Sequence, residues 1–179
     1  MNVIRQKQWS ETELIAQGFR YYPSRRQVSL VRRLPAEEAP MFIQTDWDIL
    51  VAEAGYYIAY RAGDDLRARL EDYSPRPIRP DIFKISYAPW NDIKWKPSPT
   101  ETHLLSLGCQ PYYKRVGVWA KRLTTEALVQ SMESREPSIV PPGAWVCVGI
   151  QGEPWSTTGE WIRSRYIVPA SAFLASFSK

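Results

Sequence analysis

The two halves of the chain repeat the same order of local signals, and this repeat restricts the fold more than any other feature. The segment SETELIAQGFRYY (10–22) matches SPTETHLLSLGCQPYY (98–113). Each begins with a serine followed three residues later by a glutamate, a pair that starts helices because it satisfies free amide hydrogens of the first turn. Each continues with an apolar pair, a glycine suited to a left-handed helix end, and a tyrosine pair. We expect a short helix at the start of each half.

Four further matches follow in the same order along the chain. They are VSLVRRL (28–34) with GVWAKRL (117–123), IQT (43–45) with VQS (129–131), AGYYIAY (54–60) with PGAWVCV (142–148), and DIFKISYAP (81–89) with EWIRSRYIVP (160–169). Alternating apolar residues and glycine turns predict strands for these segments, with the last pair as a closing strand. The offset between matched residues drifts, as insertions in loops would cause. The sequence therefore predicts a tandem duplication.

These signals predict an α+β protein made of two tandem copies of a small unit. Each copy has a short N-terminal helix followed by a mostly antiparallel β-sheet or partial barrel. We expect the first copy at 1–89, a linker at 90–97 and the second copy at 98–179. Fifteen prolines and nine glycines fit short elements with many turns. Trp90 and Trp95 make the linker unusually aromatic, so we expect them to pack against a domain face.

The segment PPGAWVCVGIQGEPW (141–155), with its surroundings, resembles a small bacterial domain family named for its PGDYG motif. The likeness is best over 117–169 and weaker in the first half. Ala144 stands where the family has aspartate. The resemblance implies a bacterial domain of that fold and no particular activity. The matching residues are Pro142, Gly143, Trp145, Gly152, Glu153 and Tyr166.

Composition excludes several classes of function. The chain has no run long enough for a membrane span and no apolar N-terminal signal. One histidine and two isolated cysteines offer neither a metal site nor a Ser-His-acid relay, and no nucleotide motif is present. We expect a cytoplasmic, non-enzymatic protein without catalytic residues, metal or cofactor, and without a membrane partner. Cys109 and Cys147 align with Phe19 and Ala59, so we expect both cysteines in the core.

Aromatic and basic side chains interleave in the second half, and the first half repeats the theme. A partner protein could be anchored by such residues, and nucleic acid could be bound by stacking and charge. Strand alternation could equally turn the aromatic rings to the core and the bases to water. We expect a protein partner, with nucleic acid as the alternative. The candidate residues are Tyr112, Tyr113, Lys114, Arg115, Trp119, Tyr21 and Tyr22.

Glu153 and Trp155 follow a turn flanked by Gly149 and Gly152. In one interpretation the Glu153 carboxylate accepts backbone amide hydrogens of the turn or pairs with a base. In the other, Glu153 and Trp155 line a small-ligand pocket or a hydrolytic site, with the indole as a flat wall. The sequence leaves these alternatives open.

Overall fold

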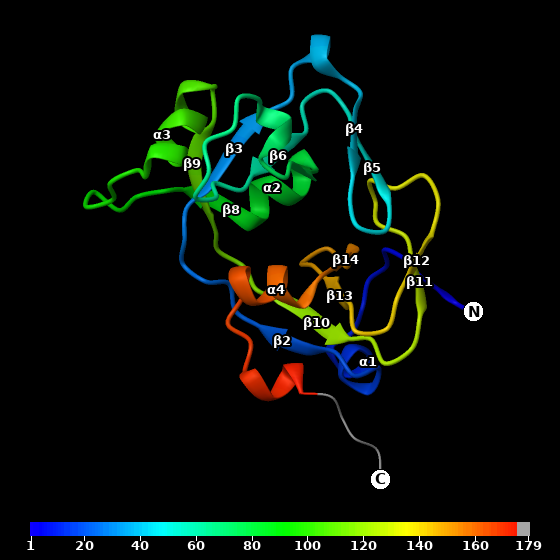
Figure 1. Cartoon of the computed structure of the whole chain (residues 1–179). Coiled ribbons are helices and arrows are strands. Elements are labelled where there is room, and N and C mark those ends of the chain that lie inside the picture. Colours follow the sequence, from blue (N-terminus) through cyan, green and yellow to red (C-terminus); the bar gives the residue numbers. More distant parts are fainter. Residues whose placement is uncertain (175–179) are drawn as a thin grey trace. The chain divides into compact units, whose positions relative to one another are not determined.

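Residues 10–22 and 98–115 each fold with the other half of the chain. The computed structural model describes residues 1–174, which form two units (Figure 1). Unit 1 contains Met1–Arg25, Asp46–Asp48 and the chain from Val116 onward, and unit 2 contains Arg26–Thr45 and Ile49–Arg115. These bounds differ from the predicted 1–89 and 98–179, because the first helix and strand of each half join the opposite unit.

Unit 1 is built on a four-stranded antiparallel sheet with the order β14-β13-β10-β2. A smaller sheet has the order β1-β11-β12, in which β1 runs parallel to β11. The elements are β1 (Val3–Ile4), α1 (Glu11–Ala16), β2 (Arg20–Tyr22), β10 (Val118–Arg122), β11 (Ala127–Val129), β12 (Ser138–Val140), β13 (Trp145–Val148), β14 (Pro154–Thr157), α4 (Gly159–Arg165) and the 3-10 helix η3 (Ala170–Phe173).

Unit 2 is built on a five-stranded antiparallel sheet with the order β7-β6-β3-β9-β8, and carries a separate β4-β5 hairpin. Its elements are β3 (Ser29–Arg33), η1 (Ala36–Glu38), β4 (Met41–Gln44), β5 (Ile49–Ala52), β6 (Tyr57–Tyr60), η2 (Leu70–Asp72), β7 (Arg76–Ile78), α2 (Pro80–Ser86), β8 (Tyr87–Pro89), α3 (Pro99–Ser106) and β9 (Gln110–Lys114).

The two larger sheets share an inner pattern of strand pairing. In unit 1, β10 lies between β13 and β2, so that Trp119 is opposite Val148 and Tyr21. In unit 2, β3 lies between β6 and β9, so that Leu30 is opposite Tyr60 and Pro111. Figure 1 shows the blue strand β2 beside β10, and the blue strand β3 beside the green β9. The predicted β-rich, mostly antiparallel α+β class is confirmed.

The helices predicted at the start of each half are present. The hydroxyl of Ser10 accepts the N–H of Glu13 at 3.1 Å, and the hydroxyl of Ser98 accepts the N–H of Glu101 at 3.1 Å. The C-cap residue of each helix is followed by a glycine with positive φ, 90° at Gly18 and 96° at Gly108. This left-handed conformation turns the chain so that the next residue buries its side chain: Phe19 in unit 1 and Cys109 in unit 2. The predicted burial of Cys109 is confirmed.

The closing strands predicted at 81–89 and 160–169 are wrong over most of their length, because Pro80–Ser86 and Gly159–Arg165 form the helices α2 and α4, and only Tyr87–Pro89 is a strand, β8. Pro80 occupies the first turn of α2, and the hydroxyl of Thr158 accepts the N–H of Trp161 at the start of α4. Ile162 and Tyr166 then face the core one helical turn apart. Seven residues contain less than two helical periods, so such a short segment is easily taken for a strand.

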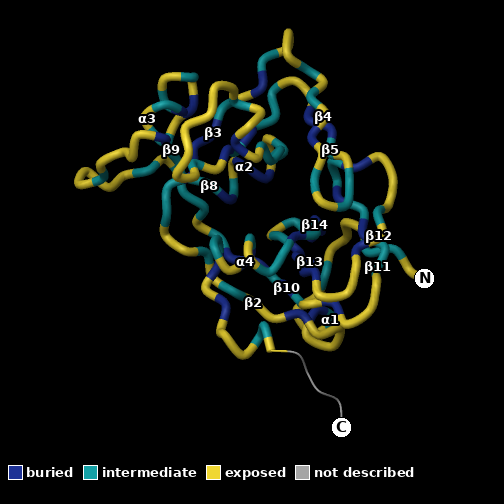
Figure 2. The backbone as a smooth tube through the Cα atoms, in the orientation of Figure 1, coloured by how far each residue is buried: buried dark blue, intermediate teal, exposed yellow. Residues whose placement is uncertain are grey.

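The sheet of unit 1 has apolar side chains on each face. Along β13, Val146 and Val148 contact the cluster that contains Leu14 of α1. Trp145 and Cys147 contact the opposite cluster, under α4. A central strand covered on both faces loses the alternation of buried and exposed residues, and all four residues of β13 are buried (Figure 2). The predicted burial of Cys147 is confirmed.

The exchanged helices give a test of this architecture. Leu14 of α1 belongs to the core of unit 1, and Leu104 of α3 belongs to the core of unit 2. Each Leu→Ala change should lower the free energy of unfolding by about 2–5 kcal/mol. In native-state hydrogen exchange, Leu14→Ala should lower protection mainly in β10 and β13, and Leu104→Ala mainly in β3 and β6. The opposite result, in which Leu14→Ala lowers protection mainly in β3 and β6 and Leu104→Ala mainly in β10 and β13, would show that each helix packs with the strands of its own half of the chain.

Candidate protein-binding surface

The nine candidate residues are divided between the two units, and the boundary within the second half of the chain lies between Arg115 and Val116. The run 108–123 therefore contributes to two units. In unit 2 lie Tyr112, Tyr113, Lys114 and Arg115. In unit 1 lie Tyr21, Tyr22, Trp119, Glu153 and Trp155.

Tyr21 is the most exposed aromatic side chain among these candidates, with 53% of its surface accessible. Its ring meets Trp119 of the neighbouring strand edge-on, with 5.8 Å between ring centroids. Its hydroxyl accepts the N–H of Gly117 at 3.0 Å. A Cβ at Gly117 would lie 2.5 Å from the Tyr21 ring and 2.4 Å from the carbonyl oxygen of Tyr22, so only glycine leaves room for this arrangement. Tyr21 is thus exposed and fixed in position.

Two bases flank this pair and donate to the C-terminal end of α1. Nη1 of Arg20 donates to the carbonyl of Ile15 at 3.3 Å, and Nζ of Lys121 donates to that of the C-cap residue Gln17 at 3.0 Å. Partial burial lowers the pKa of Lys121 below its usual value. Cations are stabilised at a helix C-terminus because its last carbonyls have no partner within the helix. We call Tyr21 and Trp119 the Tyr21 surface.

Tyr22 and Trp155 point into the protein instead. Tyr22 meets Trp145 with centroids 6.3 Å apart, and burial raises the pKa of its hydroxyl. Trp155 lies opposite Cys147 on the neighbouring strand and packs on the same cluster. Neighbouring residues of a strand point to opposite faces, which is why Tyr21 and Tyr22 have different roles.

In unit 2, Tyr112 is part of the packing and Tyr113 lies beside a cation. The ring of Tyr112 meets Phe83 of α2 edge-on at 4.9 Å, and Phe83 is stacked between Tyr57 at 3.8 Å and Tyr87 at 5.1 Å. The ring centroid of Tyr113 is 4.9 Å from the guanidinium carbon of Arg26.

The last two candidates of unit 2, Lys114 and Arg115, lie at the end of β9 and directly after it. Lys114 is half-buried and lies opposite Tyr87 of β8 in the strand register. Nε of the exposed Arg115 donates to the carbonyl of Ile85 at 3.2 Å. The backbone N–H of Arg115 donates to the carbonyl of Ser86 at 2.8 Å, which ties β9 to the end of α2.

Most of the bases in the two interleaved segments are already used within the protein. At least six of the eight donate a side-chain hydrogen bond to the chain itself, five of these to groups other than a carboxylate. These six are Arg25, Arg26, Arg32, Arg115, Lys121 and Arg122. Main-chain carbonyls accept from four of them. A phosphate backbone would have to compete with these internal acceptors.

Glu153 is only 8% exposed and serves the turn between β13 and β14. Its Oε2 accepts the N–H of Gln151 at 2.8 Å. Its Oε1 lies so close to Gly149 that a Cβ there would be 1.8 Å away. The carboxylate thus has the geometry of the first interpretation, in which it accepts backbone amide hydrogens of the turn.

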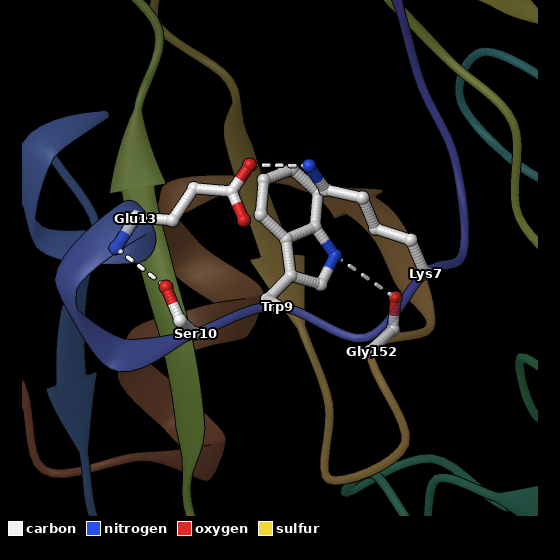
Figure 3. A network of polar contacts seen from close by, with 5 residues as sticks. All are labelled: Lys7, Trp9, Ser10, Glu13 and Gly152. Carbon is white, nitrogen blue, oxygen red and sulfur yellow. Dashed lines mark hydrogen bonds and ion pairs between the residues drawn. The ribbon is translucent and has the colours of Figure 1, made fainter.

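The N-terminal segment covers this turn, a contact that the sequence analysis missed. Nε1 of Trp9 donates to the carbonyl of Gly152 at 3.3 Å (Figure 3). Lys7 pairs with Glu13 and places its ammonium 4.1 Å from the centroid of the Trp9 ring. Trp9 directly precedes the helix cap Ser10 and packs on the cluster that contains Leu14. An apolar residue before the cap with a second one four residues after it is a known packing signal, and it could have predicted this role.

No family model, curated protein sequence or solved structure matches this chain. The resemblance to the PGDYG family therefore stays a prediction. Within residues 1–174, no three histidine, cysteine, aspartate or glutamate side chains are grouped to hold a metal ion. In the same residues, no helix has the length and apolar character to cross a bilayer. Burial raises the pKa of the Cys109 thiol to about 11, which disfavours its thiolate form.

Replacing Gly152 should disrupt the contact between the N-terminal segment and the turn. Gly152 has a φ of 75°, and a Cβ there would lie 1.7 Å from the carbonyl oxygen of Lys7. Gly152→Ala should lower the free energy of unfolding by at least about 2 kcal/mol, measured by urea denaturation. Gly63→Ala is the control, since a Cβ there meets nothing within 4 Å. Equal effects of the two changes would contradict the assigned contact.

Replacing Glu153 tests its role in the turn. Glu153→Gln keeps the shape of the side chain but removes the charge that strengthens the bond from Gln151. The free energy of unfolding should fall by about 1 kcal/mol, since a charged acceptor forms the stronger hydrogen bond. Glu126→Gln, at an exposed position, should leave stability unchanged. An unchanged stability in Glu153→Gln would favour a ligand-binding role for the carboxylate.

Proposed function

We propose that this protein is a non-enzymatic binding protein and that its partner is another protein, held by the Tyr21 surface. The observation that carries the proposal is the exposed yet fixed ring of Tyr21, supported by Trp119 and by the hydrogen bond from Gly117. Tyrosine, tryptophan and arginine are the residues most often found as energetic anchors of protein interfaces.

The fixed position of Tyr21 favours binding energetically. A side chain that is already held in one conformation loses little further entropy when a partner covers it. Tyr21 also lies on β2, which is the edge strand of its sheet. An edge strand gives a partner access to backbone groups as well as to the ring.

The bases support a protein partner over nucleic acid. Binding to nucleic acid depends chiefly on cations that neutralise phosphates. Arg20 and Lys121 instead donate to main-chain carbonyls beside the Tyr21 surface. These hydrogen bonds hold two positive charges near the aromatic pair, which is more useful for orienting a partner than for tracking a phosphate backbone.

We further propose that the two units descend from one duplicated module whose N-terminal helix and strand have been exchanged between the copies. Matched hydrogen bonds support this. The N–H of Gly55 donates to the carbonyl of Leu34 at 2.9 Å, and that of Gly143 donates to Leu123 at 2.8 Å. The two glycines have φ values of 84° and 86°. Two linked copies of a weak binding unit can also act together on one partner.

Photo-crosslinking can test the proposed surface. A photoreactive phenylalanine analogue at position 21 should cross-link to a protein in lysate of the source cells. The same analogue at Leu66, an exposed position in unit 2, should not. Without the cross-linker, Tyr21→Ala should reduce the amount of that protein recovered together with this chain from lysate about tenfold or more, as expected for an interface anchor.

The class of the partner is decided by enzyme treatment of the cross-linked adduct. An adduct whose size is unchanged by nuclease supports a protein partner. An adduct that nuclease removes, or equal labelling from positions 21 and 66, would contradict the proposal. Alanine at Tyr112 or Trp119 is less informative, because these rings also pack within their units and their loss would weaken the fold.

A further inference from the structure

Two aromatic rings of unit 2, Trp90 and Tyr113, lie against a positively charged side chain of the protein itself, and a third ring, Trp95, packs on Trp90. The ring of Trp90 meets Trp95 at 6.4 Å with an interplanar angle of 75°, and Tyr113 at 6.1 Å with an angle of 74°. The guanidinium carbon of Arg26 lies 5.1 Å from the centroid of Trp90 and 4.9 Å from that of Tyr113. We call Trp90, Trp95 and Tyr113 the Trp90 cage.

The chemistry of the Trp90 cage selects a guanidinium group. The faces of aromatic rings attract cations within about 6 Å of the ring centroid. In addition, Oδ1 of Asn91 accepts a hydrogen bond from Nη2 of Arg26 at 2.7 Å. A guanidinium can stack on the rings and donate to Asn91 at once, because its N–H groups lie in its plane. A quaternary ammonium has no N–H to donate.

The cage lies at the surface and is incompletely satisfied. Arg26 and Asn91 are exposed, and the three rings are half-buried. Nε1 of Trp90 is buried and has no hydrogen-bond acceptor. A buried donor without an acceptor is destabilising, and a ligand that brings a carbonyl group could relieve this. An arginine within a polypeptide brings a guanidinium and carbonyl groups together.

We propose that the Trp90 cage binds an arginine side chain of a partner polypeptide and that Arg26 is its internal competitor. The site lies in unit 2 and is independent of the Tyr21 surface, so the failure of one proposal leaves the other standing. An incoming arginine must displace Arg26. Arg26 leaves the cage free in only a small fraction of the molecules. The apparent affinity for an incoming arginine is therefore the intrinsic affinity multiplied by that fraction.

The test uses the full-length protein and N-acetyl-arginine amide as the probe. Binding is followed by NMR at the indole N–H of Trp90. Arg26→Ala should bind the probe at least about tenfold more tightly than the wild type, because the competitor is removed. The double variant Arg26→Ala, Trp90→Leu, followed at the indole N–H of Trp95, should not bind. Arg25→Ala should behave like the wild type, since Nε of Arg25 donates to the carbonyl of Arg163 in unit 1.

Three results would overturn the proposal. The first is a folded Arg26→Ala protein whose indole signals do not shift with the probe. The second is equal binding by Arg26→Ala and by Arg25→Ala. The third is tighter binding of N-acetyl-trimethyllysine amide than of the arginine probe, which would assign the cage to ammonium groups. If Arg26→Ala does not fold, Arg26→Gln removes the charge and keeps most of the stem, and the same outcomes apply.

Discussion

The pairing of β2 with β10 and of β9 with β3 is the constraint on which the rest of the structure depends. Paired residues are 96 to 100 positions apart between β2 and β10, and 79 to 83 positions apart between β3 and β9. The helix attached to each strand completes a core, through Leu14 in unit 1 and Leu104 in unit 2. The Tyr21 surface exists only because of such a pair, since Tyr21 and Trp119 are cross-strand neighbours. The cage in unit 2 likewise includes Tyr113 from β9.

Features that depend on interactions between residues close in the sequence were predicted correctly. The serine caps, the helix-ending glycines and the glycine turns at Gly55 and Gly143 were identified from the sequence, and each has the conformation that its chemistry requires. The helices α2 and α4 were missed because a seven-residue segment shows too little periodicity. The exchange of the first helix and strand could not be predicted. The cap and glycine signals are alike in the two halves, so they do not indicate with which unit each helix packs.

The candidate site was predicted by residue type but not by grouping. The sequence of the run 108–123 suggested one aromatic and basic surface. In the structure, its residues up to Arg115 belong to unit 2 and those from Val116 belong to unit 1. Alternation along β2 turns Tyr22 inward and Tyr21 outward, and the sequence does not say which face is covered. The sequence analysis left open whether the bases contact a partner or face water, and at least six of them donate hydrogen bonds within the protein. Their partners, chiefly carbonyls of other elements, have no signature in the sequence.

The composition of the two units also has a consequence for synthesis on the ribosome. The elements β1, α1 and β2 are synthesised before unit 2 and belong to unit 1, whose remaining strands come after residue 115. Unit 2 can be completed once β9 has been made. The N-terminal segment includes the apolar side chains of Trp9, Leu14 and Phe19. These side chains therefore have no core to pack against until the last third of the chain has been synthesised. Nascent chains stalled before that point would expose these side chains to chaperones, and unit 2 would be the first to fold.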